Sequence, residues 1–450
     1  MKYPVATLAR LGAFVFVIAV LLIGTVQSAK ADSVLTPDIP GGSVPSSIAI
    51  SPDGSRAFVS NFYDSTLTVF DTGTNSVIGL PIPMGSGPFG VSFAPNGAAA
   101  YVANFWDGTV LELDGVTGAV LGSPITVGTY PYEVAVSPDS STIYVSNSGS
   151  NTVSVIDAAT KTVIDTIAVG SDPYGLEIMP DGSKLYVSNL NADSVSVIDT
   201  TLNTVIATIA VGDKPELGAV SPDGSKFYVP NDLSNTVSVI DTSTDTVLAT
   251  IPVGANPVSV AVSPDSSKVY VANMYGPSVS IIDPATNTVS STLALTGYPT
   301  DVTFTPNGTR AFVTNWSEYI TPIDVEVAPK ITSGPAVSGT PGVAYSFQIV
   351  ATGNSAPTFS IDSGALPPGL SLNALTGHIS GNPSTSGTFN FSVKATNSVG
   401  ETTQSQSIEI ALAATGTNPT PYIVFGAILV ALGVLLLRVK FAHIRRAQIL

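Results

Sequence analysis

The sequence predicts an all-β chain with a seven-bladed β-propeller, a smaller β-sandwich and a C-terminal membrane or sorting segment. A turn of the Ser-Pro-Asp-Gly type recurs seven times at a nearly constant interval. Val, Ile, Thr, Ser and Gly are abundant between these turns, a composition that favours strands and turns over helices. Each end of the chain carries an uncharged apolar segment with basic residues beside it.

The first 31 residues have the layout of a secretory signal peptide. A basic start precedes an uncharged apolar run at residues 11–24, and Ala29 and Ala31 form a small-residue A-x-A site. We expect cleavage after Ala31. The alternative is an uncleaved membrane helix, but the run is short for a span of about 20 residues.

Seven internal repeats are the strongest signal in the chain. Each repeat holds four short segments with strand character, A to D in chain order, separated by turn residues. Four strands in about 40 residues are typical of a propeller blade, and no helical periodicity appears. The third residue of the recurring turn falls at Asp53, Asn96, Asp139, Asp181, Asp223, Asp265 and Asn307, so successive spacings are 43, 43, 42, 42, 42 and 42.

The B strands carry a recognisable tetrapeptide. It is Tyr-Val-Ser-Asn at residues 144–147 and 186–189, and Tyr-Val-Ala-Asn at 270–273. The repeats over residues 39–329 resemble the YVTN family of β-propellers. That resemblance implies the fold and leaves the function open.

The ring needs a strand from elsewhere, because the seventh repeat runs into Pro329 without a D strand. The segment from Val34 to Pro40 precedes a Gly pair, much as the D strands precede their Gly. We expect residues 33–40 to pair with the seventh blade, so that residues 33–329 form a closed propeller without an open edge.

Residues 330–411 have a different texture, rich in Pro, Gly, Ser and Thr. The run Leu-Pro-Pro-Gly-Leu at 366–370 is followed by Thr-Gly at 376–377 and Ile-Ser-Gly-Asn-Pro at 379–383. This segment resembles the Ig-like, cadherin-related modules of bacterial surface proteins, which implies an Ig-like β-sandwich. His378 stands within the run, and we expect it to be an exposed turn residue.

The C-terminal residues 412–450 have three parts: a pentapeptide, an apolar stretch at 422–437 and a basic tail. This order resembles a sortase sorting signal of the LAxTG type. The resemblance implies that a sortase cleaves the Thr415–Gly416 bond and joins Thr415 to a cell-wall amine. A plain transmembrane anchor is the alternative, since basic residues after an apolar span stay in the cytoplasm. The motif consists of Leu412, Ala413, Ala414, Thr415 and Gly416.

Composition excludes several kinds of chemistry. The chain has no Cys and two His, and its formal net charge is −16. Residues 32–415 hold nine basic and thirty-two acidic residues, a net charge of −23, which argues against nucleic-acid binding. We expect no metal and no cofactor, because the repeated turn carboxylates lie on separate blades and most simply shape their own turns.

Catalysis is the competing class of function. A secreted propeller enzyme of the lactonase or lyase type needs a placed base, often His or a metal-bound group. The repeats contain no His, so we expect a cell-surface binding, adhesion or structural protein without catalysis. A channel across the ring that holds clustered carboxylates would favour the enzyme.

Aromatic residues predict where a ligand would bind. Strands alternate in direction within a blade, so the B–C and D–A loops emerge on one face. The D–A loops carry Phe89, Tyr130, Tyr132, Tyr174 and Tyr298, and with the B–C loops they account for eleven of the 23 aromatics in residues 39–329. Large rings anchor interfaces, so we expect a glycan or protein ligand here; packing between blades or into a central channel is the alternative. The candidate ligand face consists of the B–C residues Phe62, Tyr63, Phe105, Trp106, Tyr275 and Trp316.

Overall fold

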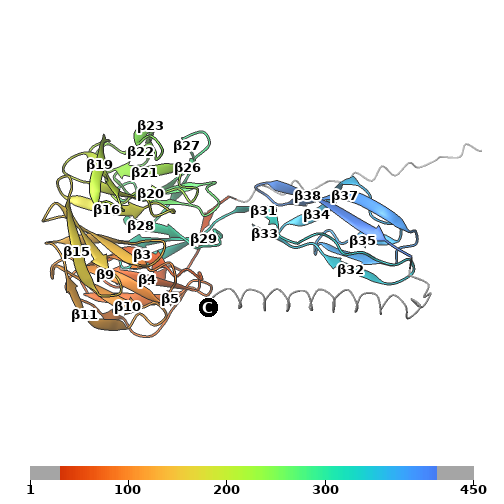
Figure 1. The fold of residues 1–450 in the computed structure, drawn as a ribbon, viewed down its shortest axis with the longest axis horizontal. Coiled ribbons are helices and arrows are strands. Elements are labelled where there is room, and N and C mark those ends of the chain that lie inside the picture. Colours follow the sequence, from red (N-terminus) through yellow and green to blue (C-terminus); the bar gives the residue numbers. More distant parts are fainter. Residues whose placement is uncertain (1–30, 413–450) are drawn as a thin grey trace, which may run out of the picture.

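The computed structural model describes residues 31–412, and all the regular secondary structure of this part of the chain is β-strand. Seven antiparallel sheets form the blades of a propeller, and a β-sandwich follows it (Figure 1). The all-β fold predicted from the sequence is therefore confirmed. No helix within residues 31–412 is long and apolar enough to cross a membrane.

The innermost A strands begin at a proline in all blades but the fifth. They are β3 (Pro45–Ile50), β8 (Pro88–Phe93), β12 (Pro131–Val136), β16 (Pro173–Ile178), β20 (Ala219–Val220), β24 (Pro257–Val262) and β28 (Pro299–Phe304). In the fifth blade only two residues are regular strand. There the preceding residues lean towards the sixth blade, where Leu217 forms a parallel bridge with Ser259.

The B and C strands form the buried middle of each blade. The B strands are β4 (Arg56–Asn61), β9 (Ala99–Asn104), β13 (Thr142–Asn147), β17 (Lys184–Asn189), β21 (Lys226–Asn231), β25 (Val269–Asn273) and β29 (Arg310–Asn315). The C strands are β5 (Thr66–Asp71), β10 (Thr109–Asp114), β14 (Thr152–Asp157), β18 (Ser194–Asp199), β22 (Thr236–Asp241), β26 (Ser278–Asp283) and β30 (Tyr319–Asp324).

The D strands form the outer edge of the ring and are mostly exposed. The first blade splits this strand into β6 (Ser76–Val77) and β7 (Ile82–Pro83). The next five blades use β11 (Val120–Thr126), β15 (Thr162–Ala168), β19 (Thr204–Ala210), β23 (Thr246–Pro252) and β27 (Thr288–Ala294).

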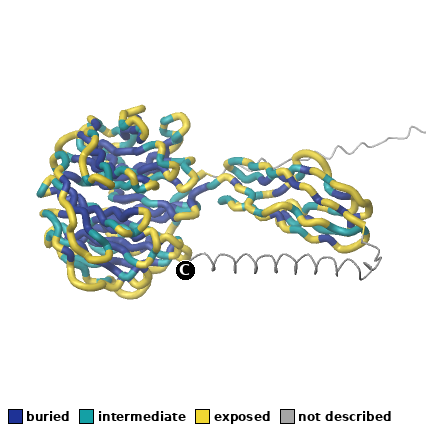
Figure 2. The backbone as a smooth tube through the Cα atoms, viewed as in Figure 1, coloured by how far each residue is buried: buried dark blue, intermediate teal, exposed yellow. Residues whose placement is uncertain are grey.

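Apolar packing joins neighbouring blades into one ring. One cluster combines Phe58 and Leu67 of the first blade with Val91 and Leu113 of the second. Equivalent clusters follow between later blades, and Figure 2 shows the buried backbone inside the propeller with exposed turns around it. Because both faces of the B and C strands are covered, their Val and Ile residues are buried on either side.

The N-terminal segment supplies the outer strand of the seventh blade. Strands β1 (Ser33–Val34) and β2 (Ile39–Pro40) both pair antiparallel with β30, with Ser33 opposite Asp324 and Ile39 opposite Ile320. Ile39 is 1% exposed and packs with Phe312 and Ile48, and so it lies between the last blade and the first. The first strands of the domain and its last blade thus close the ring.

Polar contacts between neighbouring blades accompany the apolar packing. In several blades a basic residue at the start of the B strand reaches the C–D turn of the next blade. Lys184 Nζ donates to the Thr242 carbonyl and to Asp245, and Tyr186 Oη donates to the same carboxylate. Arg310 makes the equivalent contacts to Thr72 and Asn75 across the closure. These contacts tie consecutive blades together.

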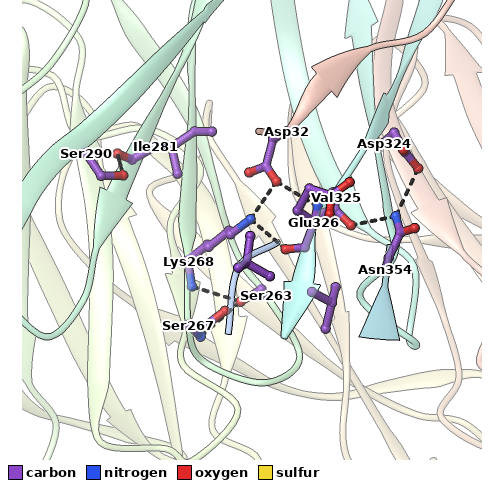
Figure 3. A network of polar contacts seen from close by, with 12 residues as sticks. Asp32, Ser263, Ser267, Lys268, Ile281, Ser290, Asp324, Val325, Glu326 and Asn354 are labelled. Carbon is purple, nitrogen blue, oxygen red and sulfur yellow. Dashed lines mark hydrogen bonds and ion pairs between the residues drawn. The ribbon is translucent and has the colours of Figure 1, made fainter. Parts of the chain in front are cut away.

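Asp32 substitutes for a turn residue at the one blade that lacks a C–D turn (Figure 3). Its carboxylate accepts from Lys268 Nζ at 2.5 Å, Tyr270 Oη at 2.7 Å and the Glu326 amide at 2.7 Å. Burial, followed by the charge of Asp32, raises the pKa of Tyr270 above its ordinary value. Asp32 therefore does for the sixth and seventh blades what Asp245 does for the fourth and fifth.

The sandwich follows the propeller without a loose linker. Its strands are β31 (Val327–Ile331), β32 (Tyr345–Gln348), β33 (Ala351–Asn354), β34 (Thr358–Gly364), β35 (Leu370–Leu372), β36 (His378–Gly381), β37 (Gly387–Thr396) and β38 (Glu401–Ile410). Strand β31 spans the predicted boundary between residues 329 and 330. His378 is the first residue of β36, and its Nε2 lies 2.9 Å from Ser346 Oγ. The expectation that it is an exposed turn residue was wrong, because β36 pairs with β32 from His378 onward.

Glu326 fixes the sandwich to the propeller. Its carboxylate is buried and accepts from the Ser355 amide and from the hydroxyls of Ser355 and Ser398. Asn354 Nδ2 donates to Asp324 Oδ1 at 3.0 Å and to the Val325 carbonyl at 2.8 Å (Figure 3). The junction is therefore a hydrogen-bonded contact between the two domains.

Candidate functional site

The recurring turn carboxylates fold back on their own backbone, as expected. Asp53 Oδ1 accepts from the Ser51 hydroxyl at 2.6 Å and the Ser55 amide at 3.0 Å, and these hydrogen bonds lower the pKa of Asp53. Asp71 does the same with the amide and hydroxyl of Thr74 at its C–D turn. Residues 31–412 contain no group of three or more His, Cys, Asp or Glu residues arranged to hold a metal ion.

The Asn that ends each B strand shapes the B–C and D–A loops, which lie on the face opposite to the A–B and C–D turns. Asn61 is fully buried; its Oδ1 accepts from the Gly42 amide, and its Nδ2 donates to the hydroxyls of Thr66 and Thr68. A Cβ on Gly42 would lie 2.5 Å from the Asn61 side chain, so the position requires Gly. Asn and Gly together fix how the B–C and D–A loops emerge, and so place the side chains at the mouth of the ring.

A cavity of about 340 Å³ occupies that mouth. Its floor is formed by the residue after the D–A proline in all seven blades, and its rim comes from B–C loops. Eight of its sixteen lining residues are aromatic, and none is basic. The floor residues are Ser46, Phe89, Tyr132, Tyr174, Glu216, Val258 and Thr300.

Five of the six predicted face residues line this cavity, namely Phe62, Tyr63, Phe105, Tyr275 and Trp316. Trp106 is outside the lining but contacts it, with ring centroids 4.7 Å from Phe105 and 6.0 Å from Phe62. The loops of the sixth, seventh, first and second blades thus bring the predicted face together. Ligand binding by these residues stays a prediction.

Four aromatic rings form a continuous row of contacts around part of the mouth. Phe62 packs edge-on against Phe89 at 5.7 Å, Phe89 lies 3.8 Å from Tyr132, and Tyr132 stacks on Tyr174 at 3.6 Å. Tyr132 is buried, while Phe89 and Tyr174 are half-buried. The three D–A rings that directly follow a proline, Phe89, Tyr132 and Tyr174, therefore pack into the channel mouth, the alternative that the sequence left open, whereas Tyr130 and Tyr298 are exposed.

The rim exposes aromatic surface to an unusual degree. Six Tyr and Trp residues within residues 31–412 are largely exposed, and all six lie in B–C or D–A loops. Large rings are normally buried, so their collection on one face indicates an interaction surface. They are Tyr63 (64% exposed), Trp106 (56%), Tyr130 (45%), Tyr275 (66%), Tyr298 (49%) and Trp316 (47%).

Two carboxylates that are not among the predicted site residues also line the mouth. Glu216 lies on the floor and Asp232 in the B–C loop above it. Burial and, less strongly, the nearby Asp232 and Asp172 carboxylates together raise the pKa of Glu216 to about 8. The signal was present in the sequence, because Glu216 is the only acid that follows a D–A proline.

A second cavity, of about 670 Å³, extends along the ring axis below the mouth. Three carboxylates line it: Glu133, Glu177 and Asp301. Asp301 is held between three blades, since it accepts from the Ser259 hydroxyl at 2.6 Å and the Ile48 amide at 3.0 Å. Burial raises the pKa of Glu177 to about 8 and, together with the charge of Asp301, raises that of Glu133.

The predicted processing sites fall mostly outside the described residues. Ala29 and the motif positions 413–416 lie there, as does the apolar stretch at 422–437. Ala31 and Leu412 are the first and last described residues, and both are exposed. Cleavage after Ala31 and sorting at Thr415 stay predictions.

Comparisons with known proteins agree with this architecture. The family described as YNCE-like beta-propeller matches residues 102–227 and 210–328, and the family described as Putative Ig domain matches residues 328–413. The propeller and the Ig-like module predicted from the sequence are thereby confirmed. No curated protein matches the chain.

One solved structure with a similar fold is hydrazine synthase of Kuenenia stuttgartiensis. It is 24% identical, the match covers 65% of this chain and 97% of that chain, and the TM-score is 0.58. At this identity the likeness concerns the fold alone. The two family matches to the propeller together span half of the chain, and so the protein belongs to the YNCE-like beta-propeller family and carries an Ig-like module after its ring.

Proposed function

We propose that this protein is a cell-surface binding protein whose propeller holds a ligand at its aromatic mouth. The observation that carries the proposal is the aromatic cavity: three of the six exposed Tyr and Trp residues line it, and the other three contact its lining. Aromatic side chains give a large contact area at low entropic cost. A cavity of about 340 Å³ suits one projecting group of a larger ligand, a glycan or a protein.

The proposal includes display at the surface. The layout of residues 1–31 favours export, and the motif at 412–416 with the apolar stretch after it favours attachment of the C-terminus to the cell wall or membrane. In this arrangement the sandwich is a spacer between the anchor and the propeller, and the partners are the surface ligand and a sortase.

The test replaces four residues of the mouth with Ala: Phe62, Trp106, Tyr275 and Trp316. We expect adhesion of cells displaying the protein to be abolished with little change in thermal stability, because three of the four side chains are largely exposed. The matched control replaces Ile164, Leu202, Ile206 and Leu248, which are exposed on the outer edge. Adhesion that survives the first variant, or is lost equally in the control, would contradict the proposal.

The class of ligand is then found by probing glycan and protein arrays with the purified chain and with the four-residue variant. Spots bound by the parent chain but not by the variant identify a ligand of the mouth. Retention on sugars and retention on proteins are separate outcomes of the same measurement.

A propeller enzyme of the lactonase or lyase type is the second candidate. The observation that favours it is the axial cavity of about 670 Å³, which three carboxylates line. Burial raises the pKa of one of them, Glu133, as a general acid requires. Turnover of a lactone panel by the purified chain, lost in Glu133→Gln, would establish this candidate in place of the first.

A further inference from the structure

The lining of the mouth combines aromatic rings with carboxyl groups. Its lining holds eight aromatic rings and the carboxylates of Glu216 and Asp232, and neither Lys nor Arg lines it. The axial cavity beneath adds Glu133, Glu177 and Asp301, again without a basic residue in its lining. Buried carboxyl groups of this kind become ionised most readily when a cation lies beside them.

The arrangement of these groups is directional. Glu216 and Asp232 belong to the fifth blade, which in a ring of seven lies across the mouth from the first and second blades. Those blades supply Phe62, Tyr63 and Phe105. A cation in the mouth would therefore have the carboxylates on one side and the rings of the first and second blades on the other, with Tyr174 and Tyr275 on the blades that flank the fifth.

The fifth blade departs from the repeat at the position of Glu216. Its A strand is regular only over Ala219–Val220, whereas the other six have six residues each. The irregular segment is nevertheless fixed, because the Glu216 amide donates to the Pro230 carbonyl and the Leu217 amide to the Val258 carbonyl. Gly175 makes room for it, since a Cβ there would lie 2.5 Å from the Glu216 carbonyl oxygen.

We infer that the mouth binds its ligand through an organic ammonium group, which the aromatic rim surrounds while the carboxylates of Glu216 and Asp232 balance its charge. The inference rests on the proposed function and names the chemistry of its ligand. A cation over aromatic faces is attracted by the ring quadrupoles, most strongly when it is desolvated. An amino sugar, a lysine side chain and a choline group all present this chemistry.

Binding of an ammonium group in the mouth is expected to release the proton of Glu216. With the mouth empty, the carboxyl of Glu216 is largely protonated at neutral pH, because its pKa is about 8. It is surrounded by Asp232, Asp172, Lys214, Tyr132 and Tyr174. A bound ammonium group favours the ionised carboxylate, so binding releases a proton and the affinity rises as the pH rises through about 8.

The experiment uses tetramethylammonium as the minimal probe of the purified chain. The two Trp residues of the sequence, Trp106 and Trp316, lie at the mouth, and so intrinsic Trp fluorescence reports on this site. We expect binding at pH 8.5 to be about tenfold tighter than at pH 6. Glu216→Gln is expected to weaken binding about tenfold at pH 8.5 and to remove the pH dependence.

The matched control is Glu177→Gln. Glu177 is also an acid with a pKa raised to about 8, but it lies in the axial cavity outside the mouth. We expect Glu177→Gln to bind tetramethylammonium as the parent chain does, and thermal melting of both variants verifies that they fold. Equal affinity of Glu216→Gln and the parent chain, or no binding at all, would overturn the inference.

Three further ligands distinguish the sources of the ammonium group. Glucosamine oligomers, lysine peptides and choline are titrated in parallel, with N-acetylglucosamine oligomers as the neutral match to the first. Equal binding of the neutral and the cationic sugar also overturns the inference. The proposed function fails separately, when the four-residue mouth variant adheres as well as the parent chain.

Discussion

At the scale of single residues, Asp32 shows how a repeat protein compensates for an incomplete repeat. The sixth blade presents Lys268 and Tyr270 to a turn that the seventh blade does not have, and Asp32 occupies that place from the other end of the chain. Its side chain is 5% exposed, so removing the charge leaves the ammonium of Lys268 without its ion-pair partner in a largely buried setting.

We expect Asp32→Asn to lower the free energy of unfolding by roughly 2 kcal/mol, because one charged partner of a buried hydrogen-bonded network is lost. The measurement is urea unfolding of the purified chain. Asp165→Asn is the matched control, since Asp165 is an exposed residue of β15. Equal midpoints for the two variants would show that the Asp32 contacts contribute nothing to stability.

At the same scale, the sequence predicted the mouth only in part. Loop position alone placed Phe62, Tyr63, Phe105, Tyr275 and Trp316 together, because the face on which a loop emerges follows from strand alternation. The environment of Glu216 could not be predicted in this way. Its raised pKa depends on burial and on carboxylates from other loops, which only the folded ring brings near it.

At the scale of elements, the closing strands follow from the repeat count, because a blade that lacks its outer strand leaves an unpaired edge. The short A strand of the fifth blade did not follow from the sequence, since its repeat has the same length as the others. Its irregularity comes from a contact with the sixth blade, through Leu217 and Ser259, that no local pattern records.

Deleting residues 33–40 is expected to lower the melting temperature of the propeller by about 7 °C. Loss of the buried Ile39 and of the strand pairing to β30 costs roughly 4 kcal/mol, and a domain of this size has a large unfolding entropy. Ile39→Ala should reproduce about half of the effect, while Pro40→Ala, at an exposed position, should not. An unchanged melting temperature after the deletion would rule out a stabilising closure.

At the scale of the whole molecule, the sandwich is joined to the propeller by direct hydrogen bonds and a short connection. Glu326 and Asn354 join the two domains by hydrogen bonds, and β31 begins within three residues of the end of β30 (Figure 1). In the proposed surface display, this junction would hold the ring away from the cell at a defined orientation.

The proposed covalent anchor predicts a change of cell fraction. In a strain that carries Thr415→Ala, the protein should move from the cell-wall fraction to the membrane fraction, because the bond a sortase would cleave is no longer recognised. Thr417→Ala, two residues beyond the motif, should leave the distribution unchanged. If Thr415→Ala also stays where the parent protein was, the apolar stretch is a plain membrane anchor.

The ring closure also sets an order of events during synthesis. Asp32 is made early, yet the amide it accepts from belongs to Glu326, which lies 294 residues further along the chain. The ribosome synthesises the N-terminal end first, so Asp32 and the closing strands β1 and β2 stay unpaired until the seventh blade has been made. Closing so long a loop is slow and comes last. A chain truncated before the seventh blade therefore cannot complete its ring, and its exposed strand edges would mark it as unfinished.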